Sequence, residues 1–370
     1  MNSITVRELK EYSKSDYLLI DIRSSLAYEN GHILDAISFP EPFDLEQLIE
    51  IIHISGKKKT IIYCTMGERS REYVSQLYDA GYEAYNLHRG YKEWLLQGED
   101  YLSDEEMSRY SRQMILPEFG SRGQRKLKSA KVLVVGAGAL GTVALTYLAA
   151  AGVGYIGIAE ADTIESSNLH RQILYGKSDI GKSKNTVAKT RLQEMNPYIS
   201  VNQHETFLTP RNITEIIRGY DFVIDATDRI ETKFLINDAC VLEGIAFCHA
   251  GVVGFEGQVM TWKEGGYPCY RCIFEDVPQG YIPNCAEAGI IGAMSGVIGS
   301  IQALEAIKYV TGIGELLLGK IYHLDGLTMK SRIVFIHKKS EACMVCGKNR
   351  TINDVSQCEE KYRQKECCKL

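Results

Sequence analysis

A cysteine stands at the end of a short apolar run, in the stretch "YCTMGERSR" at residues 63–71. A loop that begins at a cysteine and turns at a glycine points successive backbone N–H groups inward, where they attract an anion. Such a field favours the thiolate form of Cys64, and Arg69 adds a nearby cation. We therefore expect Cys64 to be a nucleophile. A buried, inert thiol is the alternative, but it would not require the loop from Gly67 to Arg69.

The length of this loop distinguishes two kinds of chemistry. In cysteine phosphatases the arginine lies one position further from the cysteine than it does here, which leaves room for a phosphate group. Arg69 follows Cys64 by five positions, and this tighter ring suits the terminal sulfur of a persulfide. The spacing favours sulfur transfer.

A second chemical motif begins at "KVLVVGAGALG", where a buried strand runs into a glycine turn. Gly136, Gly138 and Gly141 fit the pattern G-x-G-x-x-G, which lets the backbone approach a phosphate at the start of a helix. Glu160 ends the next strand-like run, where an acid would meet ribose hydroxyls. Taken alone, this pattern favours a dehydrogenase that binds NAD or FAD, with a glycine turn that binds no ligand as the alternative.

Polar residues further along the chain favour a different reaction. "SSNLHRQ" supplies Asn168 and Arg171, and "GKSK" supplies Lys184. Hydride transfer needs no extra cations, whereas cleavage of ATP between its α- and β-phosphates does, because negative charge builds on the phosphate oxygens. "VIDATD" then places Asp225 and Asp228 after a later strand, where open α/β sheets bind ligands. Asp228 is the candidate for holding Mg²⁺ on the triphosphate.

Four of the eleven cysteines form two C-x-x-C pairs, "PCYRC" and "ACMVC". Cys269 and Cys272 are expected to join Cys343 and Cys346, because four thiolates can close a tetrahedral Zn²⁺ site. A closed site of this kind is structural, with no open position for catalysis. A redox dithiol is less favoured, since neither pair opens a thioredoxin-like helix.

The other cysteines have different surroundings. Cys285 lies in the Pro- and Gly-containing stretch "VPQGYIPNCAEAGI", where a thiol is expected to be exposed and reactive. Cys240 and Cys248 have apolar neighbours and are expected in the core. Three more lie in the polar C-terminal segment: Cys358, Cys367 and Cys368. They could add a metal ligand or relay sulfur, but we expect them to lie on a disordered tail.

Alternating strand-like and helical patterns must position these motifs. In residues 1–98 the strand-like runs are 18–21, 60–63 and 83–86, which predicts a small α/β domain. Residues 99–107 form a polar hinge, in which a capping-box pattern predicts a helix starting at Asp104.

From 108 to 347 the same alternation predicts a mostly parallel, doubly wound sheet. Residues 348–370 are predicted to be an appended polar tail.

Composition limits the class of protein. The 370 residues are 45% hydrophobic and 24% charged with a net charge of −5, which is typical of a soluble globular protein. We expect no nucleic acid or membrane partner, because the charge is negative and no apolar run approaches the roughly 20 residues of a membrane span. The N-terminus "MNSITVRELKEY" lacks the apolar region of a signal peptide, so we expect a cytoplasmic protein.

From Ser103 to about Gly347 the sequence resembles the ThiF/MoeB adenylyltransferases, which are related to ubiquitin-activating enzymes. The shared motifs are "RYSRQ", "GAGALG", "SSNLHRQ", "NPY", "DATD", "CYRC", "NCAEAG" and "GSIQALEAIK". The resemblance implies a Rossmann-like domain with a four-cysteine zinc site. It also implies a homodimer that uses ATP and Mg²⁺ to adenylate the C-terminal Gly-Gly carboxylate of a ubiquitin-like sulfur carrier protein of the ThiS/MoaD type.

This resemblance implies roles position by position. The residues that it assigns to the nucleotide and Mg²⁺ are Gly136, Gly138, Gly141, Glu160, Asn168, Arg171, Lys184 and Asp228. Arg112 would reach across the homodimer into the neighbour's site, and Cys285 would attack the acyl-adenylate or resolve a later acyl-disulfide. The sequence departs from the family pattern where Ala139 replaces a common glycine and Glu160 replaces the usual aspartate.

Residues 1 to about 97 resemble the rhodanese (sulfurtransferase) domain. Asp21, Arg23, Gly31 and His32 match its "D-x-R…G-H-I" signature, which braces the fold beside the active loop in relatives. The resemblance implies that Cys64 carries sulfur as a persulfide.

Together the two resemblances imply ATP-dependent adenylation of a sulfur carrier, followed by sulfur transfer from Cys64 to give a thiocarboxylate. The sulfur donor would be a cysteine desulfurase or thiosulfate. The pathway would be of the thiamin-thiazole, molybdopterin or tRNA-thiolation type. In the first alternative, the chain is only an adenylyltransferase and its rhodanese domain is an independent sulfurtransferase. A non-catalytic scaffold is a second alternative, disfavoured by the set of Arg171, Lys184 and Asp228.

Overall fold

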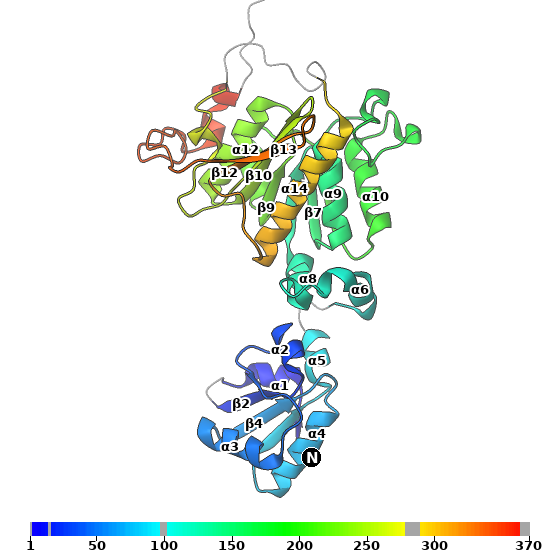
Figure 1. Ribbon diagram of the computed structural model, residues 1–370, viewed down its shortest axis with the longest axis vertical. Helices are drawn as coiled ribbons and strands as arrows, with labels where there is room; N and C mark the ends of the chain where they lie inside the picture. The colour runs from blue at the N-terminus through cyan, green and yellow to red at the C-terminus, as the bar shows by residue number, and fades with distance from the viewer. Residues whose placement is uncertain (1, 14–15, 97–101, 278–288, 363–370) are drawn as a thin grey trace, which may run out of the picture. The chain divides into compact units, whose positions relative to one another are not determined.

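The structure is a computed structural model that describes residues 2–13, 16–96, 102–277 and 289–362 (Figure 1). The chain divides into two compact units, Met1–Arg125 and Lys126–Leu370. This division lies C-terminal to the boundaries that the sequence predicts, because α6 (Asp104–Arg109) and α7 (Ser111–Met114) group with the first unit. Within the described residues no helix combines the length and the apolar character needed to cross a bilayer.

The first unit contains a sheet of five described strands in the order β1-β5-β4-β2-β3, all paired in parallel. The strands are β1 (Ser3–Ile4), β2 (Tyr17–Asp21), β3 (Ile37–Ser38), β4 (Lys59–Tyr63) and β5 (Ala84–Leu87). The helices between them are α1 (Val6–Glu11), α2 (Ser25–Glu29), α3 (Leu45–Ser55) and α4 (Arg69–Asp79), and α5 (Gly90–Leu96) follows β5. The predicted strand-like runs are thus confirmed as β2, β4 and β5.

Strand β4 is buried on both faces, which explains its continuous apolar sequence. Ile61 and Tyr63 belong to one hydrophobic cluster, and Ile62 and Cys64 belong to another. Successive side chains of a strand point to opposite faces, so Cys64 continues the alternation one residue past the strand. The cysteine therefore lies at the carboxyl end of a central strand.

The predicted helix start at Asp104 is confirmed by a capping box. The Ser103 hydroxyl accepts a hydrogen bond from the backbone N–H of Glu106, and the Glu106 carboxylate accepts one from the backbone N–H of Ser103. Two N–H groups that a helix leaves without intrahelical partners are satisfied in this way.

The second unit is built on a sheet of eight described strands in the order β13-β12-β11-β10-β9-β6-β7-β8. The strands are β6 (Lys131–Val135), β7 (Tyr155–Ala159), β8 (Ser200–His204), β9 (Phe222–Asp225), β10 (Ala246–Val253), β11 (Glu256–Trp262), β12 (Lys320–Asp325) and β13 (Lys330–Phe335). Strands β6 to β10 pair in parallel, and β11 to β13 add antiparallel pairs. The chain order reverses between β6 and β9, so the predicted mostly parallel, doubly wound sheet is confirmed.

Helices cover this sheet. The described ones are α9 (Ala139–Ala151), α10 (Lys184–Met195), α11 (Ile213–Ile217), α12 (Ile230–Glu243) and α14 (Gly292–Thr311), while α8 (Gly120–Ser129) precedes β6 and contains the point at which the two units divide. The α9 helix packs against α10 and α14 (Figure 1). The α12 helix contacts α11, β9 and β10.

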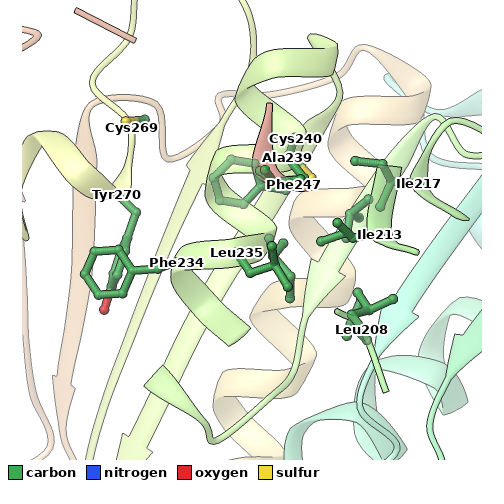
Figure 2. Close-up of a cluster of buried hydrophobic side chains, with 14 of the residues drawn as sticks. Leu208, Ile213, Ile217, Phe234, Leu235, Ala239, Cys240, Phe247, Cys269 and Tyr270 are labelled. Atoms are coloured by element: carbon green, nitrogen blue, oxygen red, sulfur yellow. The ribbon is translucent and has the colours of Figure 1, made fainter. Parts of the chain in front are cut away.

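Figure 2 shows the hydrophobic cluster around α12, in which Phe234 and Leu235 lie among side chains of α11 and β10. Cys240 belongs to this cluster and has no exposed surface, and Cys248 on β10 is equally buried. Burial raises the pKa of both thiols well above the ordinary value. These two cysteines are core residues, as the sequence predicts.

The C-terminal segment corrects one prediction. Residues 348–362 are not a detached tail, because Ile352 and Val355 are buried in the same cluster. The Tyr362 hydroxyl donates a hydrogen bond to the Asp238 carboxylate at 2.7 Å. Cys358 is half-buried against this cluster, so the expectation of a disordered position is wrong for it. Apolar residues spaced through a polar segment are sufficient to anchor it; Cys367 and Cys368 lie outside the described residues.

Candidate functional site

The loop between β4 and α4 holds the thiol of Cys64. The backbone N–H of Gly67 donates to Sγ at 3.1 Å, and the Ser70 hydroxyl lies 3.4 Å from the same sulfur. Gly67 has φ of 80°, a left-handed conformation that costs glycine little. The glycine in "YCTMGERSR" therefore allows the loop to fold back over its own cysteine.

Segments from elsewhere in the unit fix this loop. The Ser70 hydroxyl donates to Asn86 Oδ1 at 2.7 Å, and Asn86 Nδ2 donates to the Gly67 carbonyl at 3.1 Å. The backbone N–H of Tyr91 donates to the Cys64 carbonyl at 2.8 Å. A Cβ on Gly90 would lie 2.2 Å from that carbonyl oxygen, so the start of α5 packs directly on the loop.

The loop makes Cys64 more acidic than an ordinary thiol. Burial by itself raises the pKa of Cys64, because it disfavours the thiolate. Hydrogen bonds from the Ser70 side chain and from the backbone N–H groups of Ser70, Met66 and Gly67 outweigh burial and lower the pKa of Cys64 below its usual value. A lowered pKa increases the fraction of nucleophilic thiolate at neutral pH.

The structure places Arg69 differently from the expected cation beside the sulfur. Its guanidinium forms an ion pair with the Glu41 carboxylate and remains largely exposed. Among the described contacts of the Cys64 sulfur, the donors are backbone N–H groups and the Ser70 hydroxyl. Arg69 is the first residue of α4. At this position its charge is attracted more strongly to the nearby Glu41 carboxylate than to the Cys64 thiolate.

The "D-x-R…G-H" residues brace the fold beside this loop. Arg23 pairs with the buried Asp21 carboxylate at 2.6 Å and donates to the Gly31 carbonyl at 2.7 Å. Its guanidinium also lies 3.7 Å from the centre of the Tyr91 ring. Tyr91 follows Gly90 at the start of α5, so the ion pair supports the helix that packs on the Cys64 loop.

The glycine turn after β6 has no room for a side chain at two of its glycines. A Cβ on Gly141 would lie 1.9 Å from the Gly136 carbonyl oxygen, and one on Gly136 would lie 3.0 Å from the Ala226 carbonyl oxygen. Gly136 has φ of 91°. Gly138 caps the start of α9, and the nearest side-chain atom to its Cβ position is an amide nitrogen of Gln172, 3.8 Å away. The turn therefore presents backbone, with few side chains, at a helix N-terminus.

Glu160 lies under the same turn at the end of β7. Its carboxylate is buried and accepts hydrogen bonds from the backbone N–H groups of Ala137, Ala161 and Asp162 at 2.8–2.9 Å. A carboxylate has about four acceptor positions, so capacity remains for a hydroxyl group. The structure brings Glu160 to the glycine turn, and its contact with ribose stays a prediction.

The expected triphosphate residues come from two segments after β7. Asn168 ends η1 (Ser166–Asn168), and its Oδ1 accepts from the backbone N–H of Glu165. Arg171 donates to the Ser167 carbonyl at 2.8 Å. Lys184 opens α10, is largely buried, and pairs with Asp162 at 3.1 Å.

Tyr175 links these segments to the turn, since its hydroxyl lies 2.8 Å from the Ala137 carbonyl and 3.3 Å from that of Lys184. Gln172 is buried nearby, and its Oε1 has no hydrogen-bond partner in the described part of the chain. A buried, unpartnered amide oxygen is uncommon, and here it lies beside a turn expected to hold a ligand.

The two aspartates after β9 have different surroundings. Asp225 is fully buried, whereas Asp228 is exposed at the end of the following turn. Ala226 between them packs on Gly136, so the turn that carries Asp228 lies against the glycine turn. Arg112 is exposed on α7 in the other compact unit, and Cys285 lies outside the described residues.

The two C-x-x-C pairs meet in space. The Sγ atoms of Cys269, Cys272, Cys343 and Cys346 all lie within 4.8 Å of one another, with contacts from 3.4 to 3.9 Å. Zinc–sulfur bonds of about 2.3 Å in a tetrahedron place sulfur atoms roughly 3.8 Å apart. The donor set and its dimensions thus fit a tetrahedral metal ion.

Sequence reasoning missed three residues of the Cys64 site. Ser70 stands six positions after Cys64 in the quoted stretch, so it could have been found there. Asn86 ends a predicted strand and gives no local signal. Glu41 reaches Arg69 only through the fold.

Two family models match the chain. Residues 110–345 match the ThiF family, and residues 5–97 match the Rhodanese-like domain.

Two curated proteins illustrate the sequence similarity. The chain is 46% identical over 254 residues to a sulfur carrier protein adenylyltransferase from Thermus thermophilus, covering 67% of this chain and 93% of that protein. It is 42% identical over 255 residues to the adenylyltransferase and sulfurtransferase MOCS3 of Drosophila sechellia, covering 69% of this chain and 56% of that protein. The match therefore spans little more than half the length of the MOCS3 relative.

Solved structures of Escherichia coli MccB are similar in fold. The complex with ATP aligns with a TM-score of 0.57 at 25% identity, covering 68% of this chain and 77% of that one. The complex with MccA-N7isoASN aligns with a TM-score of 0.58 at 26% identity, covering 68% and 76%.

Proposed function

Because the chain belongs to the ThiF family and carries a Rhodanese-like domain, we propose that it converts the C-terminal carboxylate of a ubiquitin-like sulfur carrier protein into a thiocarboxylate. The observation that carries this proposal is the presence of two complementary sites in one chain. A glycine turn at a sheet switch point can hold a nucleotide, and a thiol with a lowered pKa can hold sulfur. Relatives named adenylyltransferase and sulfurtransferase support the combination.

The first step is adenylation. A carboxylate oxygen of the carrier's terminal Gly-Gly attacks the α-phosphorus of ATP, the bond to the β-phosphate oxygen breaks, and pyrophosphate leaves. The glycine turn and the N-terminus of α9 would bind phosphate, and Arg171 and Lys184 would offset the charge that builds on it. Mg²⁺ bound by Asp228 and phosphate oxygens would stabilise the leaving pyrophosphate. Glu160 would accept hydrogen bonds from the ribose.

The second step is sulfur transfer. The terminal sulfur of a Cys64 persulfide attacks the acyl carbon, AMP leaves, and an acyl-disulfide forms. A second thiolate, supplied by Cys285 or an external thiol, then attacks the Cys64 sulfur. The sulfur–sulfur bond breaks, the carrier leaves as a thiocarboxylate, and Cys64 remains in a disulfide that a further thiol reduces. Alternatively, Cys285 first takes the acyl group as a thioester.

The proposal includes a structural metal and a dimer. We assign Zn²⁺ to the four-cysteine cluster, because four thiolates with tetrahedral spacing suit it. In a homodimer, Arg112 of one protomer would reach the nucleotide of the other. A cytoplasmic location fits the free thiols of the described cysteines. The sulfur donor would be a cysteine desulfurase or thiosulfate, and thiamin-thiazole, molybdopterin and tRNA-thiolation pathways are the kinds that use such a product.

The intact mass of candidate Gly-Gly-ended carriers tests this function. Each carrier is incubated with Mg-ATP and a sulfur source, with either the natural protein or Cys64→Ser. We expect one carrier to exchange an oxygen for a sulfur only when Cys64 is present. If the carrier forms an adenylate but never gains sulfur, the chain is an adenylyltransferase with an independent sulfurtransferase domain.

A mixing experiment tests the dimer. Cys64→Ser and Asp228→Ala proteins are each expected to be inactive in the complete reaction. Activity restored after subunit exchange would mean that a protomer's Cys64 can serve the adenylate of its partner. Mixtures that stay inactive would restrict sulfur transfer to one chain.

A further inference from the structure

A buried charge cluster lies around Asp225 at the carboxyl end of β9, and none of its side chains takes part in the reaction proposed above. Asp225, Lys233 and His249 come from β9, α12 and β10, and each is at most 7% exposed. His249 Nδ1 lies 2.6 Å from Asp225 Oδ2, and Lys233 Nζ lies 3.5 Å from the same oxygen. Burial alone raises the pKa of Asp225, but Lys233 and His249 outweigh it and hold the pKa far below its usual range. Asp225 is therefore a buried carboxylate with two partners.

The other oxygen of Asp225 holds the turn that precedes Asp228. Oδ1 accepts from the backbone N–H of Thr227 at 3.0 Å and from its hydroxyl at 2.7 Å. The turn is also attached to β6, because the backbone N–H of Ala226 donates to the Val135 carbonyl at 2.9 Å. Thr227 is adjacent to Asp228, so the position of the exposed aspartate depends on the bonds made by Asp225.

Lys233 connects this turn to the neighbouring strand. Its ammonium donates to the Ala250 carbonyl at 2.7 Å as well as facing Asp225. The backbone of Asp225 is held separately, because Gln302 Nε2 of α14 donates to its carbonyl at 2.7 Å. Loss of the Lys233 charge would thus leave Asp225 Oδ2 with His249 as its remaining side-chain partner, while the backbone of the strand stays in place.

We infer that Lys233 is a positioning residue for the adenylation reaction, and this inference rests on the proposed function. Lys233 keeps Asp225 anionic and oriented, Asp225 fixes Thr227, and Thr227 sets the place of Asp228 beside the glycine turn. A buried lysine is costly unless it is paired and hydrogen-bonded. A methionine could fill the same volume without that cost, so stability alone does not require the charge at this position.

The test measures ATP–pyrophosphate exchange as a function of Mg²⁺ concentration, with saturating ATP and carrier. We expect Lys233→Met to raise the Mg²⁺ concentration for half-maximal rate at least about fivefold and to lower the rate at limiting Mg²⁺ by about tenfold. Lys308→Met is the matched control. Lys308 likewise pairs with a buried carboxylate, that of Glu305, but within its own helix α14, so its loss should lower thermal stability without changing the Mg²⁺ dependence.

Thr227→Val provides a second test with less risk to folding, because Thr227 is only half-buried. It removes the hydroxyl that Asp225 binds, and we expect a smaller shift of about threefold in the same direction, which Thr227→Ser should restore. The inference would be overturned if Lys233→Met and Thr227→Val both left the Mg²⁺ dependence unchanged. It would also be overturned if they lowered the rate equally at every Mg²⁺ concentration. Absence of exchange in the natural protein with every carrier would instead refute the proposed function.

Discussion

The loop after β4 and the turn after β6 both lie between a parallel strand and a helix, and both direct backbone N–H groups at an anion. In the loop the acceptor is the reactive group itself, since Gly67 donates to the Cys64 sulfur. In the turn Ala137 donates to the Glu160 carboxylate, and Lys184 is paired with Asp162. A thiolate in fixed position needs only local donors. The nucleotide proposed for the turn would need charges from several segments, so the second site depends far more on the fold around it.

The largest predicted effect comes from adding one methyl group in each region. A Cβ on Gly90 would lie 2.2 Å from the Cys64 carbonyl oxygen, and one on Gly141 would lie 1.9 Å from that of Gly136. At such distances the backbone would have to move, which costs free energy of folding because the interior is closely packed. Gly90→Ala should reduce sulfur loading of Cys64 by more than about tenfold and spare ATP–pyrophosphate exchange, and Gly141→Ala should do the opposite. Loss of both activities in either variant would mean that the two regions are not independent.

Loss of the proposed metal should affect one region more than the other. The four cysteines lie in the second unit, where Cys269 (Figure 2) and Cys343 belong to the hydrophobic cluster around α12 and the other two pack against it. Cys343→Ser should lower the midpoint of thermal unfolding of this unit by about 5 °C or more. Cys358→Ser, at a half-buried cysteine outside the cluster of four, is the matched control. Zinc content by elemental analysis should fall in the first variant alone, and equal zinc in both would contradict the assignment.

A pH profile sharpens the comparison within the first region. The pKa of Cys64 is lowered by donors to its thiolate, so alkylation by iodoacetamide should stay fast to lower pH than for an ordinary thiol. Ser70→Ala removes one donor, which destabilises the thiolate and raises the pKa. The midpoint of the rate-against-pH curve should therefore move to higher pH. A midpoint that stays in place would show that the backbone N–H groups are sufficient.

The smallest effect concerns Arg69. Its guanidinium is paired with Glu41, and in Glu41→Gln it should become available to anions near the loop. One unscreened surface charge contributes on the order of 1 kcal/mol. Loading of Cys64 from thiosulfate should therefore rise by a few-fold, measured by the mass of the persulfide. Arg69→Gln in the same background should remove the gain, and a gain that persists would exclude Arg69 as its cause.

Much of the two sites could be predicted from local sequence. The glycine turn, the cysteine loop and the helix start at Asp104 are set by backbone conformation and hydrogen bonds within a few residues, so their residue types are diagnostic. The paired C-x-x-C motifs predicted the four-cysteine cluster for the same reason, because each pair is a local unit. The alternation of strands and helices was also sufficient to predict β2, β4 and β5 of the first sheet and the mostly parallel character of the second, but not β1, β3 or the antiparallel strands β11 to β13.

What the sequence by itself determined is the set of groups that can do chemistry and the strands that carry them. Tertiary structure decided which partners those groups have. Asn86 accepts a hydrogen bond from Ser70, and Glu41 forms an ion pair with Arg69, which was expected beside the sulfur. Ile352 anchors a segment whose polar sequence resembles a free tail. These contacts join residues far apart in the chain. Burial and hydrogen bonds have opposing effects on the charge of a group, and both exist only once the chain has folded.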